Sequence, residues 1–174
     1  MTAISNIHLQ IIVTISLAFT GYIVTYLNNL RIQKRNDKLK YINQQLENFY
    51  GPLFVLSQIG QILFEVYWHK TEGLIEKDNE WHIWVENVFF PLNNELEKLI
   101  ISKAYLINES DIPTPLLSFL AHNAGYKSLI IKWKNNDFSE HHSIIPFPNG
   151  LEEYAKKSYI KIKKEQLKIL NKRW

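Results

Sequence analysis

Histidines and carboxylates in the second half of the chain are the side chains whose types could carry chemistry. His122 stands among apolar residues in the segment 119–126, which has helical spacing, and Asp137, Glu140 and His141 follow in a segment without such spacing. Functional residues concentrate in loops of that kind. Two histidines with a carboxylate could hold a zinc ion, which would suit a metal-dependent or nucleic-acid-cleaving enzyme.

Glu86 is a further candidate, because the apolar residues around it predict a largely buried helix. A zinc site would need a glutamate beside His122 and one loop histidine. His141 and His142 are neighbours in the sequence, so they cannot both point at one ion from regular structure. The metal site stays an alternative, and we expect no metal and no cofactor.

A structural role explains the same residues more simply. His122, Trp133, Asp137 and His141 are predicted to form a polar clamp that holds the loop against the helical core, because buried polar groups are paired in folded proteins. The residues that a cysteine nucleophile, a phosphate-binding loop or a serine nucleophile elbow would need are also absent. The chain has no cysteine, its six glycines are scattered, and no serine has the flanking glycines of a nucleophile elbow. We therefore expect a protein that is not an enzyme.

The element that organises the chain is an uncharged, mostly apolar run over residues 9–27. Its nineteen residues, as a helix, cover roughly 28 Å, close to the ~30 Å hydrocarbon core of a bilayer. No Lys or Arg precedes the run and five follow it closely, which is the reverse of a cleaved signal peptide. The run predicts a retained transmembrane helix, and the alternative is a buried helix of a soluble protein.

A basic cluster follows the apolar run directly. It contains one acidic residue, Asp37, and five basic residues: Arg31, Lys34, Arg35, Lys38 and Lys40. The positive-inside rule then predicts a single membrane pass, with the N-terminus outside and the remainder in the cytoplasm. We expect the five basic side chains to contact anionic lipid headgroups, at about 1 kcal/mol each.

Charge is unevenly distributed over the rest of the chain. Residues 41–150 carry seven basic and thirteen acidic side chains, whereas residues 151–174 carry eight and three. Beyond the basic cluster the only arginine is Arg173, and nucleic-acid-binding proteins usually display a basic face rich in arginine. Membrane lipids, a second copy of the chain and a cytoplasmic protein are therefore the expected partners, and nucleic acid is not.

Apolar periodicity and the absence of strand or hairpin patterns predict an all-α protein. We expect an N-terminal segment with the transmembrane helix (1–30), a basic juxtamembrane stalk helix (31–50) and a cytoplasmic bundle of about four to five helices (51–174). The helix that Pro52 opens, over 52–68, is apolar nearly all round and is predicted at the centre of the core. Pro91 is predicted to bend or restart its helix.

The end of the chain gives three further expectations. Thr114 is predicted as an N-cap, with Pro115 at the first helical position. Residues 134–150 form the longest segment without helical spacing, and residues 151–170 form a lysine-rich amphipathic helix. The residues predicted to face inward from that last helix are Tyr154, Ile160, Leu167 and Leu170.

Two sets of residues could mediate self-association. The stalk carries a seam with steps of three and four residues, which either packs within the chain's own bundle or joins a second copy. The apolar run carries small residues that would let neighbouring spans approach closely. The seam is Leu39, Ile42, Leu46 and Phe49, and the small residues are Thr14, Thr20, Gly21 and Thr25.

Several motifs together resemble a widespread set of small bacterial proteins with one N-terminal span. They are the segments 46–53 (LENFYGPL), 84–93 (WVENVFFPLN), 119–122 (FLAH) with Gly125 and Tyr126, Trp133 with 137–141 (DFSEH), and 164–167 (KEQL). The resemblance covers nearly the whole predicted cytoplasmic part. It implies a membrane-anchored helical protein and brings no defined activity.

The size, leading span and helical body are also similar to the small membrane accessory proteins of RNA-targeting CRISPR systems. That resemblance implies a multimeric, pore-like assembly that strengthens antiphage defence. Those proteins carry an Arg-x(4–6)-His motif, whereas here no histidine follows Arg31, Arg35 or Arg173 within seven residues. The leading hypothesis is therefore a self-associating, non-enzymatic membrane effector. A membrane-tethered binding module that recruits a cytoplasmic partner is the alternative, and a degenerate nuclease-like or metal-dependent enzyme is a third.

Overall fold

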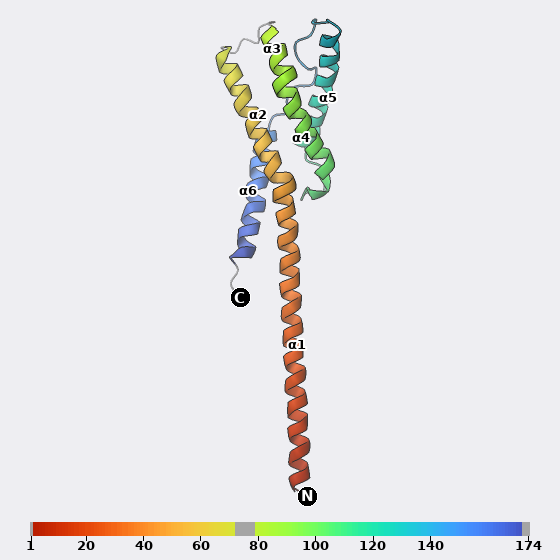
Figure 1. Cartoon of the computed structure of the whole chain (residues 1–174), viewed down its shortest axis with the longest axis vertical. Coiled ribbons are helices and arrows are strands. Elements are labelled where there is room, and N and C mark those ends of the chain that lie inside the picture. The colour runs from red at the N-terminus through yellow and green to blue at the C-terminus, as the bar shows by residue number, and fades with distance from the viewer. Residues whose placement is uncertain (1, 72–78, 172–174) are drawn as a thin grey trace. The chain divides into compact units, whose positions relative to one another are not determined.

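The structure is a computed structural model that describes residues 2–71 and 79–171, with side chains for residues 7–71 and 80–171 (Figure 1). Most of these residues are helical and no strand occurs among them, which confirms the all-α class. The chain divides into two compact units, Met1–Tyr41 and Ile42–Trp174. The second unit thus begins inside the segment predicted as a stalk.

The first unit consists of helix α1 (Thr2–Gln45), which ends within the second unit. It contains a stretch that is long and apolar enough to cross a membrane, and none of the residues in that stretch is buried. Thr14 Oγ1 donates to Gln10 O (2.9 Å), and Thr20 Oγ1 donates to Ser16 O (2.8 Å). These two hydroxyl groups are therefore hydrogen-bonded within the helix, as a lipid environment would require.

The second unit is built on four longer helices and the short turns between them. The helices are α2 (Gly51–Lys70), α4 (Phe90–Lys103), α5 (Thr114–Lys134) and α6 (Leu151–Leu170). The shorter elements are π-helical turn η1 (Leu46–Tyr50), helix α3 (Asn79–Trp84), π-helical turn η2 (Val85–Phe89) and 3-10 turn η3 (Ala104–Leu106). Helix α4 packs against both α2 and α5, and α6 packs against α2 and η1 (Figure 1).

Each of the prolines Pro52 and Pro91 follows a π-helical turn, and the two turns share one sequence pattern. Residues 47–53 read ENFYGPL and residues 86–92 read ENVFFPL. The backbone N–H before each proline bonds five residues back, from Gly51 to Leu46 O and from Phe90 to Val85 O. A proline lacks an N–H and its ring crowds the carbonyl four residues back, so one extra residue in the preceding turn accommodates it. The helix therefore continues through Pro91.

The asparagine of each pattern reinforces the turn. Asn48 Nδ2 donates to Gln44 O (3.2 Å), and Asn87 Nδ2 donates to Ile83 O (2.9 Å). The carbonyl four residues before each asparagine is thus held by a side chain while the backbone pattern changes. Two segments thirty-nine positions apart in the sequence therefore adopt the same local structure for the same reason.

Two apolar clusters form the core of the second unit. The larger one joins the end of α1, η1, α2, α4, η3, α5 and α6, and Phe49, Tyr50 and Phe119 are its largest side chains. The smaller one joins α2, α3, η2 and α5 around Trp81 and Trp133. Buried polar groups in the larger cluster are paired, since Gln45 Nε2 donates to Leu106 O (2.8 Å) and Tyr50 Oη accepts from the Asn108 N–H (2.9 Å).

The prediction that α2 lies at the centre of the core is wrong. One face of α2 packs against α4 and α6, while the opposite face is exposed. Four of the exposed apolar residues on α2 recur at steps of four, three and four on this opposite face, and we call them the α2 stripe: Val55, Ile59, Ile62 and Val66. A helix that is apolar all round is buried only where neighbours surround it, and α2 has neighbours on one side within the described residues.

Two details at the ends of helices also differ from expectation. The cap of α5 is Pro113, whose carbonyl accepts from the N–H groups of Leu116 (2.9 Å) and Leu117 (3.3 Å), so Thr114 is already helical and makes no cap. On α6 the buried residues are Leu151, Ala155, Ser158 and Ile162. Of the residues predicted to face inward, Tyr154 is half-buried, but Ile160, Leu167 and Leu170 are exposed. The inward face of α6 is turned toward η1 and α2, and small residues at 155 and 158 permit that close packing.

The seam predicted in the stalk packs within the chain at three of its four positions. Ile42 and Phe49 belong to the larger core cluster, and Leu46 packs against it. Because Ile42 and Phe49 have almost no exposed surface, they are unavailable to a second copy. Ile42, Leu46 and Phe49 therefore pack within the chain's own bundle, which is the first of the two alternatives for the seam.

Two glycines in α2 should respond oppositely to alanine. A Cβ on Gly51 would lie 2.4 Å from Leu46 O, which the π-helical turn holds in place, so Gly51→Ala should destabilise the fold by about 1–3 kcal/mol. A Cβ on Gly60 would lie 3.3 Å from Leu92 Cδ2, a side chain that can move. Gly60→Ala should then stabilise by about 0.5–1 kcal/mol through higher helix propensity. Thermal unfolding of the detergent-solubilised chain, followed by circular dichroism, measures both, and equal effects would contradict this account of η1.

Candidate functional site

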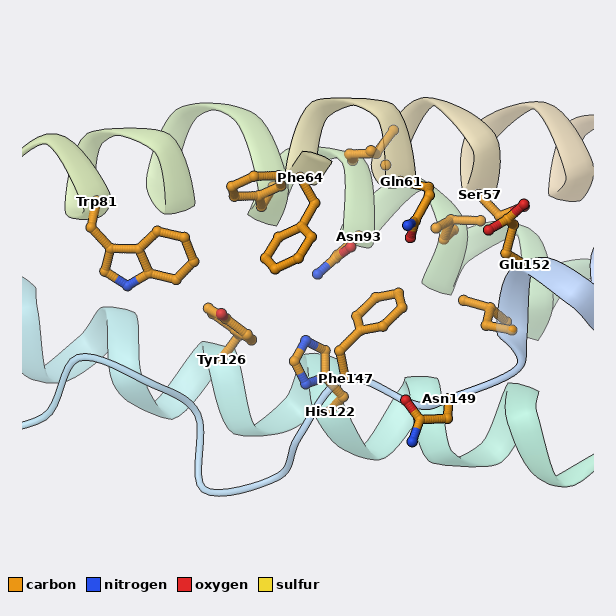
Figure 2. Close-up of a pocket in the computed structure, with 15 residues that line it drawn as sticks. Ser57, Gln61, Phe64, Trp81, Asn93, His122, Tyr126, Phe147, Asn149 and Glu152 are labelled. Carbon is orange, nitrogen blue, oxygen red and sulfur yellow. The ribbon is translucent and has the colours of Figure 1, made fainter. Parts of the chain in front are cut away.

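A cavity of about 340 Å³ lies in the second unit where the two core clusters meet (Figure 2). Its volume falls within the range typical of small-molecule sites. Helices α2, α4 and α5 supply most of its walls, and α3, η2 and the residues before and at the start of α6 supply the rest. The lining residues are Ser57, Gly60, Gln61, Phe64, Trp81, Phe89, Leu92, Asn93, Leu96, His122, Tyr126, Phe147, Asn149, Leu151 and Glu152.

The lining changes in character along the cavity. Figure 2 shows Trp81 and Tyr126 at one end and Asn149 and Glu152 at the other, with His122 between them. Aromatic rings dominate the first end and the middle, while amide and carboxylate groups gather at the second end. Such a lining would hold an apolar body by packing and orient it through a few polar contacts.

His122 presents a hydrogen-bond acceptor to the cavity. Its Nδ1 lies 2.7 Å from Ile145 O, and because a carbonyl only accepts, Nδ1 carries the proton. The other ring nitrogen, Nε2, then has a free lone pair, and Figure 2 shows that edge of the ring turned into the cavity. Burial lowers the pKa of His122, although hydrogen bonds to Ile145 and Pro146 oppose this effect. The ring is therefore neutral at pH 7.

Asn93 is a polar group at the cavity without a hydrogen-bond partner among the described residues. Its side chain is 7% exposed and makes no hydrogen bond to any described residue, and Figure 2 shows its amide pointing into the cavity. The amide atoms of Asn93 are open to the cavity, so a molecule in the cavity can pair with them. Asn93 and His122 Nε2 are therefore two convergent polar groups that await a partner within the cavity.

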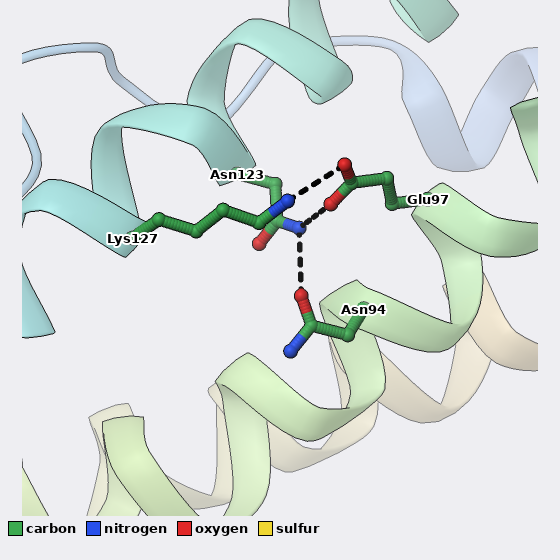
Figure 3. A network of polar contacts seen from close by, with 4 residues as sticks. All are labelled: Asn94, Glu97, Asn123 and Lys127. Carbon is green, nitrogen blue, oxygen red and sulfur yellow. Dashed lines mark hydrogen bonds and ion pairs between the residues drawn. The ribbon is translucent and has the colours of Figure 1, made fainter.

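A network of polar contacts joins the two helices that carry these groups (Figure 3). Asn123 Nδ2 donates to Asn94 Oδ1 (3.2 Å) and to a carboxylate oxygen of Glu97, and Lys127 Nζ donates to the other oxygen (2.7 Å). The hydrogen bond from Lys127 is the main reason that the pKa of Glu97 is lowered. Asn123 Oδ1 is buried without a partner among the described residues. The network thus fixes α4 against α5 directly beside Asn93 and His122.

Three ring N–H groups hold the segment 135–150 against the helices. Trp81 Nε1 donates to His141 O (2.7 Å), Trp133 Nε1 donates to Glu140 O (2.8 Å), and His122 Nδ1 donates to Ile145 O. All three acceptors are backbone carbonyls. We call this segment the clamped loop, and it brings Phe147 and Asn149 to the cavity wall.

The residues predicted as a site are only partly brought together. His122 and Trp133 both hold the clamped loop, whereas Asp137 accepts from the Ser139 N–H within the loop (3.1 Å) and Glu140 pairs with Lys132 (2.9 Å). His141 Nδ1 lies 3.2 Å from His82 Nε2. Glu86 is half-buried and acts on His82 through its charge, which raises the pKa of that imidazole against the larger effect of burial. Among the described residues, no three of these groups are placed to hold a metal ion.

Several residues of the cavity, and His82 outside it, were not predicted from the sequence. Asn93 had a detectable signal, because it interrupts the buried side of a helix whose neighbouring positions, Leu96 and Ile100, are core residues. His82 had none, since its pairing with His141 joins segments 59 positions apart. The packing of Trp81 and Phe147 against the cavity likewise depends on contacts that periodicity does not report.

Comparisons of this chain with protein-family models, with curated proteins and with solved structures found no match. The function proposed below therefore depends on the geometry of the cavity and on the apolar stretch of α1.

Stability should fall as the pH is lowered through the histidine range. Burial lowers the pKa values of His82, His122 and His142, so the folded state favours their neutral forms. Their contribution is fully present above the ordinary histidine pKa of about 6.5 and is lost as the pH falls toward the lower folded values. The melting temperature, measured by circular dichroism, should be level between pH 7 and 8 and fall between pH 7 and 5.

A substitution at His122 tests whether protonation of this histidine contributes to the loss of stability at low pH. His122→Gln can still donate to Ile145 O but does not titrate, so its melting temperature should decline less steeply with falling pH than that of the wild type. His69→Gln, at an exposed position near the end of α2, is the matched control and should follow the wild-type curve. Parallel curves for His122→Gln and the wild type would contradict the assignment.

Proposed function

We propose that this protein is a membrane-anchored binding module whose helical domain captures a small organic molecule. In this proposal α1 crosses the inner membrane of a bacterium once, with the N-terminus outside and the second unit in the cytoplasm. The exposed apolar stretch of α1 supports the anchor, and the basic cluster that follows it supports the orientation. Among that cluster, Arg31, Lys34, Lys38 and Lys40 are exposed and suited to anionic headgroups.

The observation that carries the binding proposal is the pair of unpaired polar groups in the cavity. Asn93 and His122 Nε2 converge on a space of about 340 Å³ whose other walls are mostly apolar. A fold without a ligand would gain stability by filling that space with apolar side chains. Retained polar groups that cost stability are typical of a binding site.

We place the protein with binding modules rather than with enzymes. His122 is the titratable group nearest the middle of the cavity, and its lowered pKa makes it a weak base at pH 7. Its protonated nitrogen is held by a backbone carbonyl, so the ring is fixed in place and offers one acceptor. These properties favour recognition of a ligand over proton transfer, and the proposal needs no metal or cofactor.

Replacing Asn93 separates a binding role from a structural one. Asn93→Leu removes an unpaired amide and partly fills the cavity, so it should raise the stability of the ligand-free chain by about 1 kcal/mol. Asn94→Leu, at the next position, removes an amide that is hydrogen-bonded and should lower stability instead. Thermal unfolding measures both changes. The same Asn93 variant should lose binding of indole-3-ethanol, a neutral aromatic alcohol, in isothermal titration, whereas a destabilised Asn93→Leu would mark the amide as structural.

A second candidate is a self-associating membrane effector, which is what the resemblance to the CRISPR accessory proteins implies, including a pore-like role in antiphage defence. The α2 stripe supports self-association, because its steps of four, three and four residues match the seam of a helix pair. Small residues of α1 add support, since Thr14, Gly21 and Thr25 share a helix face and a Cβ on Gly21 would meet no atom within 4 Å. Thr20 lies off that face.

A charge on the α2 stripe tests the second candidate. Ile62 is 57% exposed, so Ile62→Glu should leave the monomer folded but weaken a paired interface by placing a carboxylate in it. Ile131 on α5 is 61% exposed, and Ile131→Glu is the matched control. Native mass spectrometry in detergent should show oligomers for the wild type and for the control, and mainly monomers for Ile62→Glu. A wild-type chain that is only monomeric would exclude this candidate.

A further inference from the structure

Among the described residues that line the cavity, Glu152 is the only one that carries a formal charge at pH 7. It lies in the first turn of α6 and accepts a hydrogen bond from Gln58 Nε2. It forms no ion pair with any described residue. The next residue, Glu153, points elsewhere and pairs with Lys157 (2.6 Å). Of the two adjacent carboxylates, Glu153 is therefore ion-paired, whereas Glu152 lines the cavity without an ion pair to a described residue.

The opposite end of the cavity is suited to an aromatic body. Figure 2 shows the rings of Phe64, Trp81 and Tyr126 facing the same space, away from Glu152. Aromatic walls favour a flat apolar group by packing, and they also attract a nearby cation through their ring faces. The cavity therefore has an aromatic end and an anionic end.

The middle of the cavity argues against an anionic ligand. No Lys or Arg lies among the described lining residues, and His122 offers a lone pair rather than a positive charge. A carboxylate or phosphate would face Glu152 at one end and the His122 acceptor in the middle without a cationic partner. Burying a charge without such a partner is unfavourable. A ligand with an N–H donor would meet acceptors at both positions.

We infer that the cavity selects a protonated amine that carries an aromatic ring, with the ammonium group directed to Glu152 and the ring held between Phe64, Trp81 and Tyr126. This inference rests on the proposed binding function and adds to it the chemical class of the ligand. His122 Nε2 and Asn93 then bind polar atoms along the body of the ligand. Glu152 acts as the residue that determines specificity for a positive charge.

A series of three indole compounds with different side-chain ends tests the selection. Tryptamine carries an ammonium group, indole-3-ethanol a hydroxyl group and indole-3-acetate a carboxylate, so the ring is constant while the charge changes. Isothermal titration of the full chain in detergent should give the tightest binding for tryptamine. Because a charge-assisted hydrogen bond is roughly twice as strong as a neutral one, tryptamine should bind at least about tenfold more tightly than indole-3-ethanol, and indole-3-acetate should bind most weakly.

Two neighbouring variants identify the carboxylate responsible. Glu152→Gln should reduce the affinity for tryptamine at least about tenfold and so remove its advantage over indole-3-ethanol, because the amide oxygen can still accept from Gln58 but carries no charge. Glu153→Gln changes the charge of α6 equally but lies outside the cavity, so it should bind all three compounds as the wild type does.

The outcomes separate this inference from the proposed function. If indole-3-ethanol binds and Asn93→Leu abolishes that binding, while tryptamine binds no better, the cavity is a binding site but the inferred amine class is wrong. Equal losses in Glu152→Gln and Glu153→Gln would also overturn the inference, because they would indicate a general charge effect. If none of the three compounds binds the wild type, the inference fails, and a destabilised Asn93→Leu would then overturn the proposed function as well.

Discussion

Three hydrogen bonds from ring N–H groups to the clamped loop are the interactions on which the rest of the second unit depends. Trp81, Trp133 and His122 donate to three backbone carbonyls of the loop, so these three hydrogen bonds do not depend on which side chains the loop carries. The hydrogen bond from His122 also fixes which ring nitrogen carries the proton. One contact therefore closes the cavity wall and sets the polarity of the group that faces the cavity, and a change at His122 would alter both together.

Residues that join the helices and residues that line the cavity occupy neighbouring positions on α4 and α5. On α4, the amide of Asn94 is hydrogen-bonded in the network with Asn123, while the amide of Asn93 is left for the cavity. On α5, Asn123 belongs to the network and His122 belongs to the cavity. Adjacent positions on a helix face directions about 100° apart, so one residue can brace two helices while its neighbour lines the space between them. The network thus joins α4 to α5 beside the cavity.

The two π-helical turns explain how prolines occur within long helical segments of this chain. Pro52 and Pro91 each lie in the pattern Glu-Asn-x-aromatic-x-Pro-Leu. The residue before each proline makes a backbone hydrogen bond to the carbonyl five residues back. The wider turn shifts the helix face, which changes which residues point to the core on either side of the proline. Phe49 and Tyr50 in η1 lie in the larger core cluster, while Phe89 in η2 lines the cavity. The same type of π-helical turn therefore contributes to the larger core cluster at η1 and to the cavity wall at η2.

The sequence by itself determined the features that depend on neighbours along the chain. These are the all-α class, the apolar stretch followed by basic residues, the non-helical segment before Gly150 and the final helix from Leu151. Pro52 was predicted to open a helix, but the helix continues through it by way of η1. Only the tertiary structure decided which side of each helix is covered. The α2 stripe and Ile160 are exposed, although their periodicity resembles that of core residues, because burial depends on what packs against a helix rather than on its own pattern. The pairing of His82 with His141 and the unpaired amide of Asn93 were decided at the same level, since both depend on contacts between distant segments.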